Sequence, residues 1–173
     1  MNVITNHLMD KILSGYCLDR SGIHGVFHWA RVYANGMLLA DKTGADKDVV
    51  ALFAVLHDSK RISDDWDGAH GARAAKFAES LNGKFFDLDD AQLEQLYTAC
   101  LLHNSGATEA DMTVRVCWDS DRLDLGRVGI TPDPAMLCTP DARRPDILAR
   151  ADQNAVRNVF PENAPAELAD LRT

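Results

Sequence analysis

Residues 46–61 read DKDVVALFAVLHDSKR, an apolar run that ends in an imidazole, a carboxylate and two cations. Between Asp46 and His57 the apolar side chains occupy nearly every face of a helix, and such a helix is normally buried. We therefore expect a central helix over residues 46–57. His57 and Asp58 form a polar pair at its end, which is costly in a core but offers two ligands to a metal ion.

Apolar residues recur at helical spacing along almost the whole chain, and this period predicts an all-α fold. Residues 114–118 are rich in β-branched side chains, but no partner strand is apparent elsewhere, so we expect a helix there too. Three prolines between residues 128 and 140 predict an irregular segment. The expected helices cover residues 3–15, 25–39, 46–57, 68–81, 89–102, a stretch from about 111, and 145–159, with a short helix or a frayed end over 161–173.

The length and composition fit one globular domain over residues 1–173. Hydrophobic residues make up 46% of the chain, enough for a core without disulfide bonds. The net charge of −8 argues against nucleic acid or an anionic membrane surface as a partner. A phosphorylated substrate stays compatible with it, because bound cations would reverse the local field. Four aromatic residues are expected to pack in the core: Trp66, Phe85, Phe86 and Trp118.

The cysteines and the first residues bear on the compartment. Four cysteines, none of them in a C-x-x-C pair, indicate a reducing environment, and each is expected to be a small buried residue. Residues 1–15 contain no basic region followed by an apolar stretch. We therefore expect neither a signal peptide nor a membrane span, and the cytoplasm is the expected location.

Six residues supply nitrogen and oxygen ligands for one or two divalent ions. Each falls on or just past an apolar helix, so that several helices of a bundle can direct them at one centre. His57 and Asp58 would point about 100° apart on a regular helix. At a helix end they can converge on one ion, or Asp58 can bridge two. The six candidate ligands are His28, His57, Asp58, His70, His103 and Asp121.

Four short segments place these ligands in a recognisable order of motifs. Residues 28–32 read HWARV, residues 51–58 form an apolar run that ends in HD, His103-Asn104 follows another apolar stretch, and residues 119–124 read DSDRLD. This order resembles the HD-domain superfamily of metal-dependent phosphohydrolases. Its members open with H-x-x-R-V, continue through HD and a later histidine, and close with D-x-D-R-L-D.

The resemblance covers roughly residues 23–130 of the chain. It implies a single-domain, all-α orthogonal helical bundle of the HD-domain type, with a helical extension over about residues 140–173. A first ion would be held by His28, His57, Asp58 and Asp121. In dinuclear members a second ion would be held by His70 and His103, with Asp58 bridging. In mononuclear members the two later histidines contact phosphate or water instead.

The last ligand has an alternative within the same segment. Asp119 competes with Asp121 for this role, and we prefer Asp121 because it directly precedes Arg122-Leu123, as in the family's D-R-L. Asp119 would then either hydrogen-bond to a metal-ligating residue and orient it, or lie on the helix surface.

The resemblance implies a metal-dependent phosphohydrolase that acts on a small phosphorylated metabolite or nucleotide, with a metal-activated water as the nucleophile. Asp58 could orient that water where it is not fully used as a ligand. Lys60 and Arg61 follow directly and either meet the phosphate or form a solvated helix end. Arg31 either binds substrate or pairs with a carboxylate. The mixed ligand set selects poorly among Mn, Fe, Mg, Zn, Co and Ni.

Two other functions would use the same residues. Some HD proteins hold two irons with this six-ligand set and oxidise a substrate with dioxygen. A non-catalytic module could also have kept the metal site, although the intact ligand set argues against it. Hydrolysis is the commoner use and is our first expectation. The sequence after Asp121 contains no G-Y-P segment of the kind found in cyclic-di-GMP phosphodiesterases. The substrate and the oligomeric state stay open.

Overall fold

The apolar run forms the central helix α3 (Lys47–Leu56) of the computed structural model, which describes residues 3–172. The side chain of Asp46 accepts hydrogen bonds from the backbone N–H groups of Asp48 and Val49 and thereby caps the helix. Every residue from Val49 to Leu56 is buried. Because no face of this stretch is left to solvent, other helices have to surround it.

The described residues form a single all-helical bundle. Among them there is no strand, and an isolated β-bridge joins Asn82 to Phe86. None of the helices described over residues 3–172 combines the length and the apolar character needed to cross a bilayer. Around α3 lie α1 (Asn6–Leu13), α2 (Val26–Thr43), α4 (His70–Leu81), α5 (Asp90–Leu102), α6 (Met112–Arg122), α7 (Pro145–Val156) and α8 (Ala166–Ala169), with two short 3-10 helices, η1 (Leu125–Val128) and η2 (Pro134–Met136).

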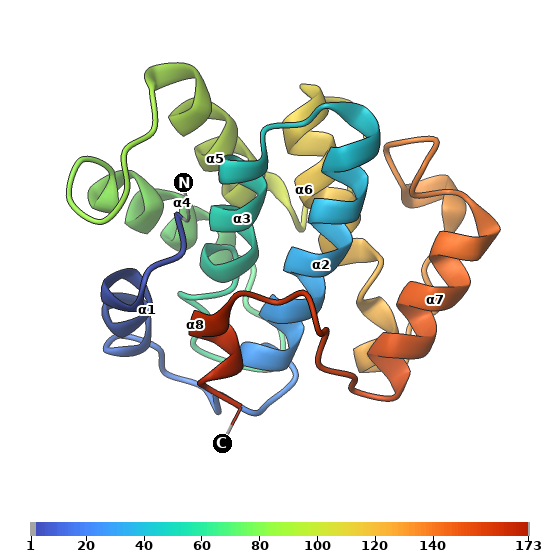
Figure 1. Ribbon diagram of the computed structural model, residues 1–173, viewed down its shortest axis with the longest axis horizontal. Coiled ribbons are helices and arrows are strands. Elements are labelled where there is room, and N and C mark those ends of the chain that lie inside the picture. The colour runs from blue at the N-terminus through green and yellow to red at the C-terminus, as the bar shows by residue number, and fades with distance from the viewer. Residues whose placement is uncertain (1–2, 173) are drawn as a thin grey trace.

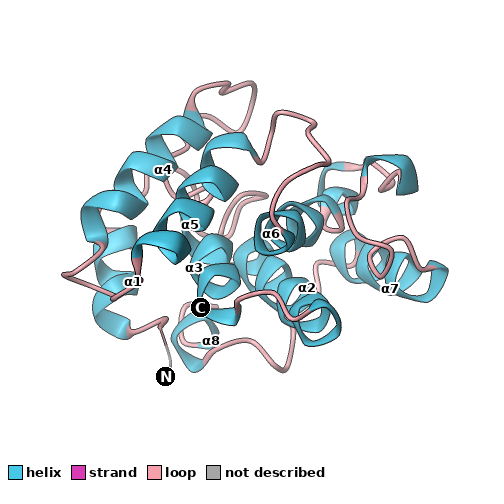
Figure 2. Cartoon of the chain, turned by 90° about the horizontal axis from the view of Figure 1, so that it is seen from above, coloured by secondary structure: helices cyan, strands magenta, loops and turns pink. Residues whose placement is uncertain are grey.

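The packing of these helices places α3 at the centre of the bundle. Helix α3 contacts α2, α5, α6 and α4, while α4 packs along α5 and α7 packs on η1 (Figure 1). Viewed from above, α1 and α4 lie at one side of the molecule and α7 at the other (Figure 2). Trp29 of α2, Phe53 of α3 and Trp118 of α6 are almost completely buried in the shared core. The residues that follow α3 and α5 are therefore held inside the protein.

Most expected helices are present, and the ends of α1, α2 and α7 differ most from the expectation. Helix α1 begins at Asn6, after its N-cap Thr5, and ends at Leu13. Helix α2 continues four residues past Leu39 and ends where Gly44 adopts a left-handed φ of 75°. Helix α7 begins at Pro145 as expected but ends at Val156. It ends there because Asn158 adopts a φ of 50°, a left-handed conformation that asparagine tolerates better than most residues.

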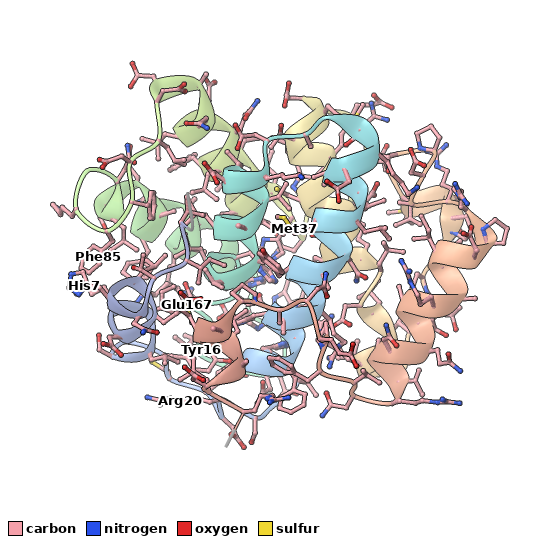
Figure 3. The ribbon with its side chains drawn as sticks, viewed as in Figure 1. His7, Tyr16, Arg20, Met37, Phe85 and Glu167 are labelled. Atoms are coloured by element: carbon pink, nitrogen blue, oxygen red, sulfur yellow. The ribbon has the colours of Figure 1, made fainter. Side chains whose placement is uncertain are left out.

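The core expectations hold for most of the aromatic residues and cysteines. Trp118 and Phe86 are buried, and the partly buried Phe85 stacks on His7 with ring centroids 4.5 Å apart (Figure 3). The expectation for Trp66 is wrong, since this residue lies in the polar loop before α4 and is 90% exposed. Three cysteines are buried as expected, whereas Cys17 is exposed.

Candidate metal centre

The six candidate ligands lie on or beside five different helices and meet inside the bundle. His28 is on the first turn of α2, and Asp121 is on the last turn of α6. His57 and His103 cap the C-terminal ends of α3 and α5, Asp58 follows His57, and His70 is the first residue of α4. Five of the six are buried, and the side chain of Asp121 is 14% exposed. Each of these helix ends is fixed by packing against α3 or its neighbours.

One group of ligand atoms surrounds the Oδ2 atom of Asp58. The Nε2 atoms of His28 and His57 lie 3.1 Å apart, at 3.6 and 3.7 Å from Asp58 Oδ2. The Oδ1 atom of Asp121 lies 3.4 Å from His28 Nε2 and 3.7 Å from His57 Nε2. Ligands about 2.1 Å from a metal ion are themselves about 3.0 to 3.4 Å apart in octahedral and tetrahedral geometries. These separations are therefore close to those of a coordination shell.

A second group surrounds the other oxygen of the same carboxylate. The Nε2 atoms of His70 and His103 lie 2.7 Å apart, and they lie 3.2 and 3.7 Å from Asp58 Oδ1. Asp58 thus turns one oxygen toward each pair of histidines. Both groups have the composition and spacing of a metal site, and Asp58 belongs to both.

The hydrogen bonds of the four histidines explain why their Nε2 atoms point inward. The Nδ1 atom of His57 faces the carbonyl oxygen of Phe53 at 3.0 Å, and that of His103 faces the carbonyl oxygen of Cys100 at 2.8 Å. The Nδ1 atoms of the remaining two histidines face acceptors as well: His28 faces Asp124 Oδ2 at 2.7 Å, and His70 faces the carbonyl oxygen of Asp67. Since a carbonyl or carboxylate oxygen can only accept, each Nδ1 carries the proton. Each Nε2 then offers a lone pair to the centre.

This arrangement fits a bound cation better than it fits a protein core without one. The Nε2 atoms of His70 and His103 lie 2.7 Å apart, and those of His28 and His57 lie 3.1 Å apart. With the proton of each neutral imidazole on Nδ1, two nitrogen lone pairs face each other in both pairs. Among the described residues, Asp58 Oδ1 and Asp121 Oδ1 are buried without a hydrogen-bond donor. Leaving such atoms unpaired costs about 1–3 kcal/mol each, and more for charged groups. The buried histidine and aspartate groups can therefore hold a metal ion.

The electrostatics favour a neutral imidazole at two of the candidate ligands and an ionised carboxylate at two others. Burial lowers the pKa of His28 and His57, which favours the neutral imidazole. Burial is the largest single effect and would raise the pKa of Asp58 and Asp121, but the surrounding histidines, joined by Arg127 at Asp121, together outweigh it, and both pKa values lie below the ordinary value. At His103 burial would lower the pKa, but the contacts with Asp58 and Asp121 and with the Cys100 carbonyl together outweigh it and raise the pKa, so this imidazole holds a second proton more readily than His28 or His57. Two ionised carboxylates thus stand among imidazoles, as in many sites for divalent metals.

The two cations after the His-Asp pair occupy different places. Arg61 borders the centre, because its guanidinium NH1 lies 3.5 Å from Asp58 Oδ1 and 3.1 Å from His70 Nε2. Lys60, which was expected either to meet a phosphate or to form a solvated helix end, contacts a different part of the protein. Its ammonium lies 3.7 Å from the centroid of the Phe77 ring, on the other side of the turn. Successive residues of the turn point apart, so only one of the two cations can face the ligands.

The other arginine beside the centre is Arg127, on η1. Its NH1 lies 3.9 Å from Asp121 Oδ1, and its Nε donates to the carbonyl oxygen of Ile23 at 2.9 Å. The side chain is 9% exposed. Arg61 and Arg127 therefore place one positive charge beside each of the two ionised ligand carboxylates.

The structure separates the roles of the two aspartates of α6. Asp119 is completely buried, and its carboxylate accepts hydrogen bonds from the N–H groups of Cys138 and Thr139 and from the Thr139 hydroxyl, at 2.6 to 2.8 Å. Its oxygens are thus used to hold the segment after η2. Asp121 faces His28 and His57 instead, and it is the aspartate that the sequence analysis preferred as the last ligand.

Two residues near the ligands escaped the sequence analysis. The Oδ1 atom of Asp124 accepts a hydrogen bond from Arg31 Nε at 2.6 Å, so Arg31 pairs with a carboxylate. The Oδ2 atom of Asp124 faces His28 Nδ1. The sequence offered one signal for Asp124, namely its place at the end of the DSDRLD segment, one turn after Asp121. His24 is buried one turn before His28, with Nδ1 3.7 Å from Asp58 Oδ2.

Among the described residues, neither ring nitrogen of His24 has a hydrogen-bond partner. Burial lowers its pKa to about 4, so the imidazole is neutral near pH 7. The Tyr16 hydroxyl donates to the His24 carbonyl oxygen at 2.8 Å and fixes the loop that carries it. His24 is therefore positioned to contact whatever lies at the metal centre.

Comparison with protein-family models, with curated proteins and with solved structures gives no match. The function is therefore inferred from the motifs and the geometry of the centre.

Proposed function

We propose that this protein is a metal-dependent phosphohydrolase that acts on a small phosphorylated metabolite or nucleotide. The observation that carries the proposal is the position of Asp58, whose two oxygens each face a separate pair of histidine Nε2 atoms. A carboxylate between two sets of ligands suits two metal ions a few ångströms apart, an arrangement common in enzymes that hydrolyse phosphate esters. The order of the ligands in the sequence supports membership of the HD-domain superfamily, which we propose on the same grounds.

The ligand set fits divalent ions such as Mn, Fe, Zn, Co or Ni, with Mg as a further candidate. His28, His57, Asp58 and Asp121 would hold one ion, and His70, His103 and Asp58 the other. When bound, such ions lower the pKa of a coordinated water and polarise a phosphoryl oxygen.

The protein's own residues contribute positive charge and orientation. Arg61 and Arg127 lie next to Asp58 and Asp121, so each guanidinium is within reach of an anion bound at the centre. His24 adds a buried, neutral imidazole beside Asp58 that can donate a hydrogen bond to a substrate oxygen. The pair of Arg31 and Asp124 keeps His28 in the tautomer that presents Nε2.

An oxygenase with two irons is the second candidate. It is favoured by the completeness of the ligand set, since four histidines and two aspartates converge and Asp58 belongs to both groups. The two arginines at the centre favour a phosphorylated substrate over this alternative, because oxidation of a neutral substrate gives them no role.

The test is an activity assay with defined metals. The purified chain is loaded with Mn²⁺, Fe²⁺, Co²⁺, Ni²⁺, Zn²⁺ or Mg²⁺ and assayed for phosphate release from a panel of nucleotides and sugar phosphates. We expect release that requires a metal, is lost in His57→Ala, and is retained in Lys76→Gln, an exposed control on α4. Consumption of dioxygen by the iron-loaded protein, with no phosphate release under any metal, would overturn the proposal in favour of the oxygenase.

A further inference from the structure

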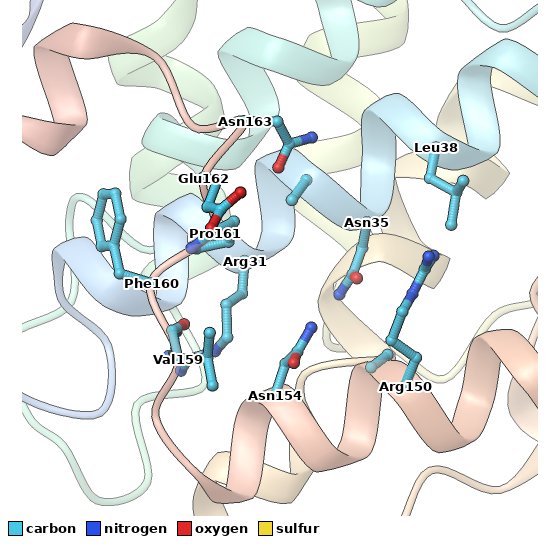
Figure 4. A pocket seen from close by; sticks show the side chains of 12 residues that line it. Arg31, Asn35, Leu38, Arg150, Asn154, Val159, Phe160, Pro161, Glu162 and Asn163 are labelled. Carbon is cyan, nitrogen blue, oxygen red and sulfur yellow. Dashed lines mark hydrogen bonds between the residues drawn. The ribbon is translucent and has the colours of Figure 1, made fainter.

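A cavity of about 540 Å³ lies between α2, α7 and the segment 159–163, apart from the metal centre (Figure 4). Its volume is within the range of about 300–1,000 Å³ that is typical of small-molecule sites. None of the six candidate ligands lines it. The cavity is therefore a second place where this protein can bind a small molecule, and it is independent of the proposed hydrolase function.

The wall nearest the core is held in place by Arg31. Its Nε donates to Asp124 Oδ1 at 2.6 Å, and its NH1 donates to Asn158 Oδ1 at 2.8 Å. Asn158 reaches this position through its left-handed backbone conformation, which ends α7 and turns the chain back toward α2. The positive charge of Arg31 is balanced by Asp124, so it adds little net charge to the cavity.

The remaining charges of the cavity have opposite signs. Arg150 projects from α7, and Glu162 projects from the segment after it, so that in the close view they stand at opposite sides of the space (Figure 4). Both side chains belong to exposed residues and can reorient toward a ligand. The wall therefore offers one cationic end and one anionic end.

Carboxamides and small apolar side chains line the cavity between these two charged residues. Asn35 is one turn after Arg31 on α2, and Asn154 is one turn after Arg150 on α7, so the two asparagines face each other across the cavity (Figure 4). Asn163 adds a third carboxamide. Carboxamides both donate and accept hydrogen bonds. They suit a polar ligand without selecting the sign of its charge.

We propose that this cavity binds a small zwitterion of the amino-acid type, with its carboxylate at Arg150 and its ammonium at Glu162. A simple anion would meet the Glu162 carboxylate and a simple cation would meet the Arg150 guanidinium, whereas a zwitterion pairs with both. The carboxamides of Asn35, Asn154 and Asn163 hydrogen-bond its polar atoms.

The test uses ω-amino acids of increasing length, from glycine to 6-aminohexanoate, added to the full metal-loaded chain. The series varies the separation of the two charges, and its longer members do not form the small chelate rings by which glycine binds metals. Binding is followed through the side-chain amide signals of the asparagines in ¹⁵N-correlated spectra. We expect one length to bind best, and Arg150→Gln and Glu162→Gln each to weaken it about tenfold or more.

The control is His57→Ala, in which the metal centre is impaired and this binding should be unchanged. Because Arg150 and Glu162 are exposed, neither substitution threatens the fold. Absence of binding at millimolar concentrations by every member of the series would overturn the proposal. So would affinities that Glu162→Gln and Arg150→Gln leave unchanged, or binding that is lost only in His57→Ala, which would assign the amino acid to the metal centre.

Discussion

Two aspartates on helix α6 should respond oppositely to the same substitution. Asp119→Asn and Asp121→Asn each replace one carboxylate by its carboxamide, two residues apart on one helix. Asp119 holds the backbone at Cys138 and Thr139, whereas Asp121 faces His28 and His57. We expect Asp119→Asn to destabilise the protein without changing its metal content, and Asp121→Asn to reduce metal content with little effect on the stability of the metal-free protein.

The magnitude for Asp119 follows from its three hydrogen bonds. Oδ1 accepts from the N–H of Cys138, and Oδ2 accepts from the N–H and the hydroxyl of Thr139. Whichever oxygen becomes an amino group, at least one backbone N–H loses its acceptor in a fully buried place. A lost charge-assisted hydrogen bond of about 1.5–3 kcal/mol and an unpaired buried donor of about 1–3 kcal/mol give a total of about 2.5–6 kcal/mol. In a chain of 173 residues this lowers the Tm by about 5–24 °C.

For Asp121 the expected loss of stability without metal is about 1 kcal/mol or less, because its Oδ1 has no hydrogen-bond donor and its contact with Arg127 is 3.9 Å long. Urea unfolding in EDTA, followed by circular dichroism, gives both free energies, and elemental analysis of the metal-loaded proteins gives the metal content. The reasoning would be refuted if Asp119→Asn lost metal at unchanged stability, or if Asp121→Asn were as destabilised as Asp119→Asn.

Two further predictions concern substrate binding and pH. Arg61→Gln should lower kcat/KM for a phosphate ester by about tenfold or more at unchanged metal content. Lys60→Gln should leave kcat/KM unchanged, because the Lys60 ammonium lies on the Phe77 ring. Equal losses of kcat/KM in the two variants would contradict this prediction. The metal-free protein should lose stability as the pH falls from 7 to 5. Burial lowers the pKa of His28 and His57 in the folded state, so below about pH 6.5 the unfolded chain takes up protons that the folded chain does not. The raised pKa of His103 acts in the opposite direction but involves one histidine against three, since the pKa of His24 is lowered as well, and urea midpoints at the two pH values decide the sign.

The fold was largely predictable because its helices carry local signals. Asp89 caps α5 in a capping box with Gln92, a pair of residues three apart that can be read in the sequence. Residues 114–118 are helical despite their β-branched side chains, since Val114 and Val116 pack into the core beside α3. The ends of α2 and α7 were misjudged because each depends on a single backbone conformation, at Gly44 and Asn158, that periodicity does not report.

The site was predictable as a set of residues but not as a set of orientations. The motif order indicated six candidate ligands, and the structure brings their side chains together. It did not separate Lys60 from Arg61, because which cation faces the centre depends on the direction of one turn. Asp124 and His24 were missed because their roles arise from contacts across the bundle, with His28 and with Asp58.

The arrangement around Asp58 can be tested most directly by counting metal ions. Equilibrium dialysis against Mn²⁺ or Zn²⁺, followed by elemental analysis, compares the wild-type chain with His103→Ala and Asp58→Ala. We expect about two ions per wild-type chain, about one in His103→Ala, which keeps the group around His28 and His57, and close to none in Asp58→Ala, which removes the carboxylate shared by both groups. A wild-type chain that binds no metal, or Asp58→Ala that binds as much as the wild type, would contradict the bridging role of Asp58.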